Sequence, residues 1–62
     1  MAKKKIRDLT MEDIPQCWGK LFKIDNAMGM CLIRGAASKS QEVFDKLKNS
    51  IPDVLLDREV EL

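Results

Sequence analysis

Histidine is absent from this 62-residue chain, and cysteine occurs only twice, at Cys17 and Cys31. A structural zinc site needs about four Cys or His ligands, so the chain offers too few of them. Neither thiol has a histidine that could activate it as a nucleophile. We therefore expect two reduced cysteines that act as small apolar side chains, with no metal site and no catalytic cysteine.

Glycine and long apolar runs are also scarce. The three glycines form no phosphate-binding loop, so neither a nucleotide cofactor nor enzymatic activity is expected. The longest apolar run is far shorter than the roughly 18 residues of a membrane span, and no apolar signal-peptide core follows Lys3–Lys5. We expect a cytoplasmic protein that does not bind a membrane.

The size of the chain limits its stability. Residues 1–62 make a single domain, and 45% of them are apolar and 34% charged, as in a folded globular protein. A domain of this size buries only about 60% of the surface that its unfolded chain exposes, so it usually depends on disulfides, metals or association. Because a disulfide and a metal are both disfavoured here, association is the expected stabiliser.

The most apolar segment of the chain runs from Asn26 to Gly35. It is continuously apolar, whereas its neighbours are apolar on one side only. Such a run is typical of a strand that is buried on both faces. We predict a central strand here, followed by a loop over residues 35–38.

Two helices are predicted on either side of this segment. The first begins with a capping-box pattern at Thr10 to Asp13 and has one apolar face, formed by Ile14, Cys17, Trp18, Leu21 and Phe22. The second begins at Ser38 or Ser40 and turns Val43, Phe44, Leu47 and Ile51 inward. Pro52 ends it, because proline disfavours helical geometry in the preceding residue.

The two ends of the chain are less certain in structure and opposite in charge. Residues 54–62 alternate as a one-sided strand, but a short helix after Pro52 is the competing interpretation. Residues 5–9 resemble a weak strand but could equally be a disordered arm, and residues 1–5 could form a flexible basic arm. The first seven residues carry four cations and no acid, whereas residues 51–62 carry four acids and one cation. This contrast favours side-by-side packing of the two ends, within one molecule or between two.

These elements predict an α+β fold, a small two-layer β-α-β-α-β domain with a three-stranded sheet and two helices on one face. An all-α fold of three or four short helices is the alternative. In the sheet, parallel crossovers would leave Met28, Met30 and Leu32 on a face that the chain cannot cover. We predict these three as partner-binding residues of a non-enzymatic interaction or regulatory module, which either forms a homodimer or regulates another protein by contact.

Two other surfaces remain open as alternatives. Lys3, Lys4, Lys5 and Arg7 could contact nucleic acid, although a net charge of +1 is low for that role. Trp18 and Phe22 lie one helical turn apart and could form a recognition hot spot, although such a pair is more often core. Of the two, Trp18 is the one expected to reach an edge.

Two short resemblances accompany this interpretation. The second half of the chain, with Ile51-Pro52-Asp53-Val54 leading into the last strand, is similar in outline to small heavy-metal-associated domains. That family's two-cysteine metal loop is absent from Gly35-Ala36-Ala37-Ser38, so the likeness implies a fold without the metal. The opening from Ile6 to Ile14 resembles the first strand, turn and helix of acetyl-coenzyme A-dependent acetyltransferases, but their cofactor loop is missing.

Overall fold

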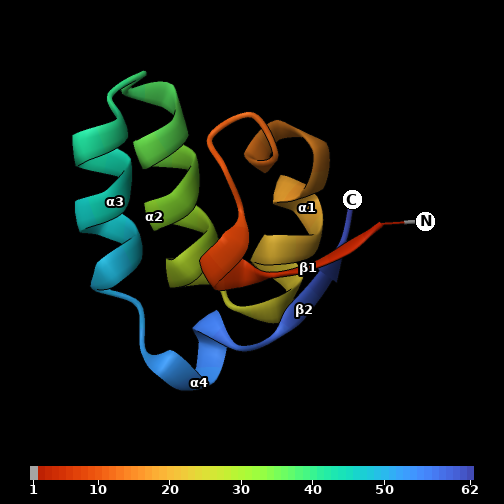
Figure 1. Cartoon of the computed structure of the whole chain (residues 1–62). Coiled ribbons are helices and arrows are strands. Elements are labelled where there is room, and N and C mark those ends of the chain that lie inside the picture. The colour runs from red at the N-terminus through yellow and green to blue at the C-terminus, as the bar shows by residue number, and fades with distance from the viewer. Residues whose placement is uncertain (1) are drawn as a thin grey trace.

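A computed structural model describes residues 2–62, in which helices predominate and two short strands pair (Figure 1). In chain order the elements are β1 (Lys3–Lys5), the 3-10 helix η1 (Ile6–Asp8), α1 (Ile14–Ile24), α2 (Asn26–Ala37), α3 (Gln41–Asn49), α4 (Asp53–Leu56) and β2 (Glu59–Glu61). This mostly helical arrangement with one small sheet is compatible with the broad α+β class and with the helical alternative. The three-stranded sheet is wrong, because the described residues form one sheet of two strands.

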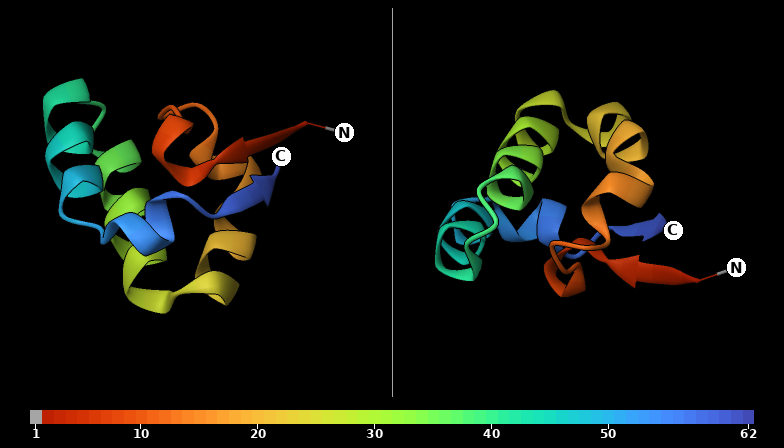
Figure 2. Two further views of the ribbon diagram at one scale, coloured as in Figure 1. Left: turned by 60° about the horizontal axis from the view of Figure 1, so that its bottom comes forward. Right: turned by 90° about the horizontal axis from the view of Figure 1, so that it is seen from above.

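Helix α2 lies between α1 and α3, as the second view in Figure 2 shows. The central strand predicted over Asn26–Gly35 is wrong, because that segment belongs to α2. Asp25 is extended, and its carboxylate accepts a hydrogen bond from the backbone N–H of Met28 at 2.8 Å. This N-cap starts the helix. A helix that packs between two others buries more than one side. Its sequence is therefore apolar over most of its length and resembles that of a strand buried on both faces.

The loop predicted at residues 35–38 begins later than expected. Helix α2 continues to Ala37, and the connection to α3 passes through Lys39, whose φ of 57° lies in the left-handed region. The side chain of Ser40 then accepts a hydrogen bond from the backbone N–H of Val43 at 3.3 Å. The prediction that Ser38 or Ser40 caps this helix is thus confirmed for Ser40.

Helix α1 is confirmed, but it begins at Ile14, after a turn over residues 11–13, and not directly after Thr10. Asp13 reaches back and accepts a hydrogen bond from the backbone N–H of Thr10 at 3.0 Å, which is the role of the acid in a capping box. Pro15 occupies the first turn, where the lost backbone donor costs little. Of the predicted inner face, Ile14, Cys17 and Leu21 are buried.

Both interpretations of the C-terminal segment are correct in part. The short helix α4 follows Pro52 directly, as the competing interpretation has it. A strand also forms, but it is confined to Glu59–Glu61. The turn between them ends where the Arg58 backbone N–H bonds to the Leu55 carbonyl oxygen at 3.0 Å.

The two ends of the chain lie side by side, as their opposite charges predict. β1 and β2 pair antiparallel, with Lys3 opposite Glu61, Lys4 opposite Val60 and Lys5 opposite Glu59 (Figure 1). The parallel crossovers of the predicted sheet are therefore absent from the described chain. Within the predicted arm of residues 1–5, residues 3–5 form β1, and residue 1 lies outside the described part of the chain.

The core is enclosed by helices on one side and by η1, α4 and the strands on the other (Figure 2). Its fully buried side chains are Ile6, Leu9, Ile14, Leu21, Met28, Leu32 and Phe44, and Ile51, Leu56 and Val60 of the last third of the chain are also buried. The predicted uncovered sheet face does not exist, because the segment that should carry it is the middle helix. The reason for expecting a second copy on that face is lost with it.

Helix α2 approaches both neighbouring helices at glycines. A Cβ atom built on Gly29 would lie 2.9 Å from Cγ of Phe22 in α1, and one built on Gly35 would lie 3.0 Å from Cα of Phe44 in α3. Carbon atoms in van der Waals contact are usually about 3.5–4.0 Å apart. Only glycine leaves room for the two phenylalanines at these crossings.

Candidate interaction surface

The structure separates the three predicted partner-binding residues. Met28 is 2% exposed and Leu32 is fully buried, so both belong to the core. Met30 is 48% exposed and lies on the outer side of α2. Of the predicted set, Met30 alone lies where a partner can reach it.

The predicted nucleic-acid contacts lie together at the N-terminal end, and each faces a carboxylate. Lys4 forms an ion pair with Asp13 at 3.0 Å, and Arg7 forms one with Asp57 at 2.7 Å. Lys3 and Lys5 lie opposite the two glutamates of β2 in the strand register. The basic segment is therefore matched by acidic groups of its own chain and presents little unbalanced positive charge to a phosphate backbone.

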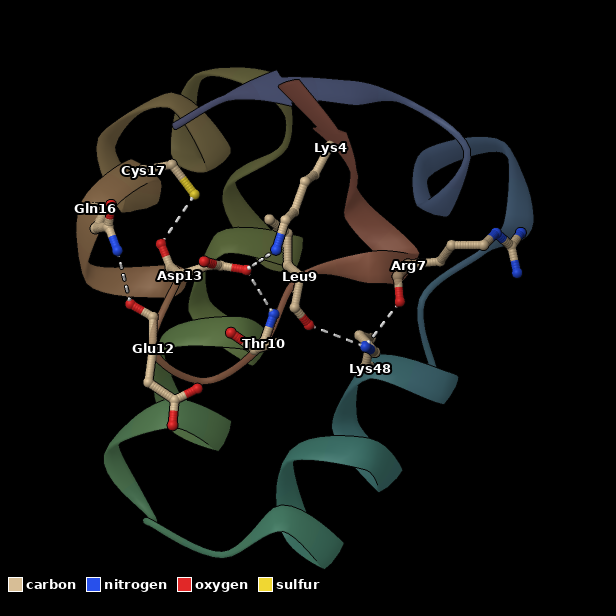
Figure 3. A network of polar contacts seen from close by, with 9 residues as sticks. All are labelled: Lys4, Arg7, Leu9, Thr10, Glu12, Asp13, Gln16, Cys17 and Lys48. Carbon is tan, nitrogen blue, oxygen red and sulfur yellow. Dashed lines mark hydrogen bonds and ion pairs between the residues drawn. The ribbon is translucent and has the colours of Figure 1, made fainter. Parts of the chain in front are cut away.

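Asp13 joins β1 to the start of α1 through a small polar network (Figure 3). Its carboxylate accepts hydrogen bonds from the Thr10 backbone and from Lys4 Nζ, and its carbonyl oxygen accepts one from the Cys17 thiol at 3.4 Å. The Thr10 N–H and then the Lys4 ammonium lower the pKa of Asp13. The carboxylate is therefore stabilised in its charged form in the folded protein.

We expect Asp13→Asn to lower the free energy of unfolding near neutral pH by about 1–2 kcal/mol, because charge-assisted, partly buried hydrogen bonds are weakened. A carboxylate with a lowered folded pKa stabilises the protein above its unfolded pKa, at about pH 4 and higher, and this contribution is lost as the pH falls through the folded pKa. The difference between the two proteins should therefore shrink below about pH 4.

Urea unfolding at a series of pH values measures this effect. Asp8→Asn is the matched control, because Asp8 is an exposed carboxylate of η1. A difference between wild type and Asp13→Asn that stays constant down to acidic pH would show that the network does not depend on the ionised carboxylate.

The largest aromatic side chain of the protein lies on its surface. Trp18 is 51% exposed, and its ring meets the Phe22 ring edge-on with centroids 5.6 Å apart. The expectation that Trp18 reaches an edge is confirmed. Phe22 is half-buried because it packs against Gly29 at the crossing of α1 and α2.

Apolar side chains of α2 continue this surface. Met30 follows Gly29 in the chain, and Ile33 lies one helical turn beyond Gly29, half-buried. Residues three and four apart on a helix are neighbours, so Met30 and Ile33 lie together beside the crossing. We name the set of Trp18, Phe22, Met30 and Ile33 the α1–α2 face.

An open hollow lies beside Trp18 on α1. Its volume is about 400 Å³, and it is lined by Trp18, Gly19, Lys20 and Lys23 together with residues 15–17. Gly19 faces open space, since a Cβ atom built on it would have no neighbour within 4 Å. The hollow thus gives a partner side access to the exposed indole ring.

The charge around the α1–α2 face is of one sign. Helices α1 and α2 contain Lys20, Lys23 and Arg34 and no acidic residue. Asp25 lies between the two helices, and its carboxylate is bound to the Met28 backbone N–H. Lys20 Nζ donates a hydrogen bond to the Glu61 carbonyl oxygen at 3.2 Å, so Lys23 and Arg34 are the cations of the two helices that have no hydrogen-bond or ion-pair partner among residues 2–62.

The two cysteines do not form a reactive pair. Both are free, Cys17 is buried, and Cys31 is half-buried. Burial, followed by the charge of Asp13, raises the pKa of Cys17 and so favours the protonated thiol, which is a poor nucleophile. Among the described side chains, no three His, Cys, Asp or Glu residues are gathered where they could hold a metal ion.

Sequence reasoning left the α1–α2 face largely unassigned. The sequence names Trp18 and Phe22 as a possible pair on a helix and Met30 as a contact, but it places Met30 on a central strand that does not form. The absence of any acid from residues 14–24 and 26–37 is a signal that could have been used.

None of the helices within residues 2–62 combines the length and the apolar character that crossing a membrane requires. In comparisons with known proteins, no protein family, curated protein or solved structure matches the chain.

Proposed function

We propose that this protein is a non-enzymatic interaction module that regulates a partner protein by contact through the α1–α2 face. The exposure of Trp18 is the observation that supports this most strongly. A chain with only three aromatic residues would gain most stability by burying its single tryptophan. Tryptophan is instead enriched among the residues that dominate binding energy at protein interfaces.

The other members of the face support the same role. Met30 is flexible and polarisable, and such side chains adapt to the shape of a partner. Phe22 and Ile33 are half-buried, so they provide a firm apolar floor beneath the two exposed side chains. A rigid floor lowers the conformational entropy lost on binding.

The N-terminal segment offers less support for the nucleic-acid alternative. Lys4 and Arg7 are already in ion pairs, and Lys3 and Lys5 face glutamates across the sheet. Releasing them for phosphate contacts would break these interactions. The protein-binding proposal requires no such rearrangement.

Trp18→Ala and Met30→Lys test the proposal. Each should weaken a partner complex by about tenfold or more, because each removes an apolar anchor at the centre of the face. Neither should change the free energy of unfolding by more than about 1 kcal/mol, because both side chains are exposed. Val54→Lys is the control, since Val54 is 76% exposed but lies on α4.

The measurement is a comparative pull-down from cells that express the protein, followed by calorimetry with each purified candidate. A protein that binds the wild type and Val54→Lys, and binds both face variants about tenfold more weakly, supports the proposal. Partners that bind all four proteins equally, or a wild type that retains only nucleic acid, would show that the face is not the functional surface.

A further inference from the structure

We infer that the α1–α2 face binds an acidic amphipathic helix supplied by another protein. This inference rests on the proposed function and specifies the class of partner. It combines three observations: the uniform sign of charge on α1 and α2, the antiparallel arrangement of these helices, and the distribution of acids elsewhere in the chain.

The charge pattern specifies an acidic partner. Lys23 lines the hollow beside Trp18, and Arg34 lies one turn beyond Met30, so each cation lies near one exposed apolar side chain of the face. Both are exposed, and neither has an ion-pair partner among residues 2–62. Carboxylates placed around the apolar contacts of a partner would meet these cations, which favours correct pairing and fast association.

The shape of the surface suits a helix. Helices α1 and α2 run side by side in opposite directions (Figure 1), and Phe22 of α1 packs against Gly29 of α2 where they cross. Met30 follows Gly29 in α2, and Ile33 lies one helical turn beyond Gly29. An apolar strip between two helices is the usual receptor for one face of a third, with anchors spaced by three or four residues. A strand is a poorer fit, because β1 and β2 belong to a different part of the molecule and offer no edge beside Met30.

A second copy of the chain is a poorer partner than an acidic helix. In a symmetric dimer through this face, Lys23 and Arg34 would approach the same cations of the other copy. The acids of α3 are already engaged, since Glu42 lies 3.7 Å from Lys46 and Asp45 accepts a hydrogen bond from Gln41. Contact between α3 and the α1–α2 face of another copy would be head-to-tail, so it would build a ring or a filament rather than a symmetric dimer.

Designed peptides test the inference directly. The first is a tryptophan-free helix of about 18 residues with leucines on one face and glutamates flanking them. The second has lysine in place of every glutamate, and the third has the composition of the first in an order without an apolar face. Trp18 is the only tryptophan of the protein, so its fluorescence reports contact with each peptide.

We expect the acidic amphipathic peptide to shift the Trp18 emission to shorter wavelength and to bind at least about tenfold more tightly than the other two. The double variant Lys23→Glu and Arg34→Glu should reverse the preference between the glutamate and lysine peptides. Lys46→Glu is the matched control, because Lys46 is an exposed cation on α3, and it should leave the preference unchanged.

Each other result has a definite meaning. Equal binding of the glutamate and lysine peptides would overturn the acidic partner while leaving an apolar interaction surface, as proposed above, intact. Binding of none of the peptides, or binding of oligothymidylate or phosphatidylserine vesicles as tightly as the acidic peptide, would overturn the inference. Concentration-dependent doubling of the mass of the free protein, abolished by Met30→Lys, would assign the face to a second copy instead.

Discussion

Phe44→Ala should lower the free energy of unfolding by about 3–5 kcal/mol, the usual cost of removing a fully buried phenylalanine. The side chain is fully buried and packs from α3 against the backbone of α2 at Gly35. A chain of this length is expected to have only about 3–9 kcal/mol of stability in total. The variant should therefore be largely unfolded at physiological temperature.

Thermal and urea unfolding followed by circular dichroism measure the loss. Val43→Ala is the matched control in the neighbouring position, because Val43 is exposed, and it should cost less than about 1 kcal/mol. Two variants of equal stability would contradict the packing of α3 against α2.

Gly35→Ala should destabilise the protein by about 1–3 kcal/mol, although alanine is the better helix former. A methyl group at this position would lie 2.9 Å from Cδ1 and 3.0 Å from Cα of Phe44. The ring can shift, but the backbone atom moves only if α3 moves away from α2. The steric cost therefore exceeds the gain in helix propensity.

Gly19→Ala provides the opposite result in the same protein. Gly19 lies within α1 and faces open space, so alanine should stabilise the fold by about 0.5–1 kcal/mol. Urea unfolding of the two variants measures the difference.

Adding Phe44→Leu to Gly35→Ala should recover part of the loss, because the smaller side chain makes room for the methyl group. Stabilisation by both alanines would show that α2 and α3 are not in close contact at Gly35.

Helix boundaries that depend on side-chain capping could be predicted from the sequence. Asp13, which directly precedes α1, bonds to the Thr10 backbone, and Ser40 caps α3, so a local hydrogen bond marks each of these helix starts. The start of α2 was missed because Asp25 ends α1 and caps α2 at the same time. In the sequence, such a residue resembles the end of one helix and does not reveal that a second helix begins directly after it.

The error in α2 also explains the error in the site. In a strand, Met28, Met30 and Leu32 would share one face, because side chains alternate with a period of two. In a helix, each residue turns by about 100°, so Met28 and Leu32 share a face and Met30 points to the other side. The prediction of which methionine is buried therefore depends on whether side chains repeat every two residues, as in a strand, or about every 3.6, as in a helix. A run of apolar residues does not distinguish the two repeats.

The surface could be predicted only in its parts. Trp18 was expected at an edge, and Met30 was expected to contact a partner, but their position on one face depends on α1 and α2 being adjacent antiparallel helices. The pairing of the two chain ends was predicted correctly, because it depends on charge rather than on element type.

The antiparallel pairing of β1 with β2 affects the order in which the fold assembles. The crossings of α1 with α2 and of α2 with α3 join helices that are neighbours in the sequence. Such local contacts cost little conformational entropy of the chain and form quickly. The strands lie at opposite ends of the sequence, so their pairing must close a loop through nearly the whole chain. Ile6 and Val60 cannot be enclosed until that closure occurs. The α1–α2 face is built from adjacent segments, so its parts can come together before the sheet completes the core.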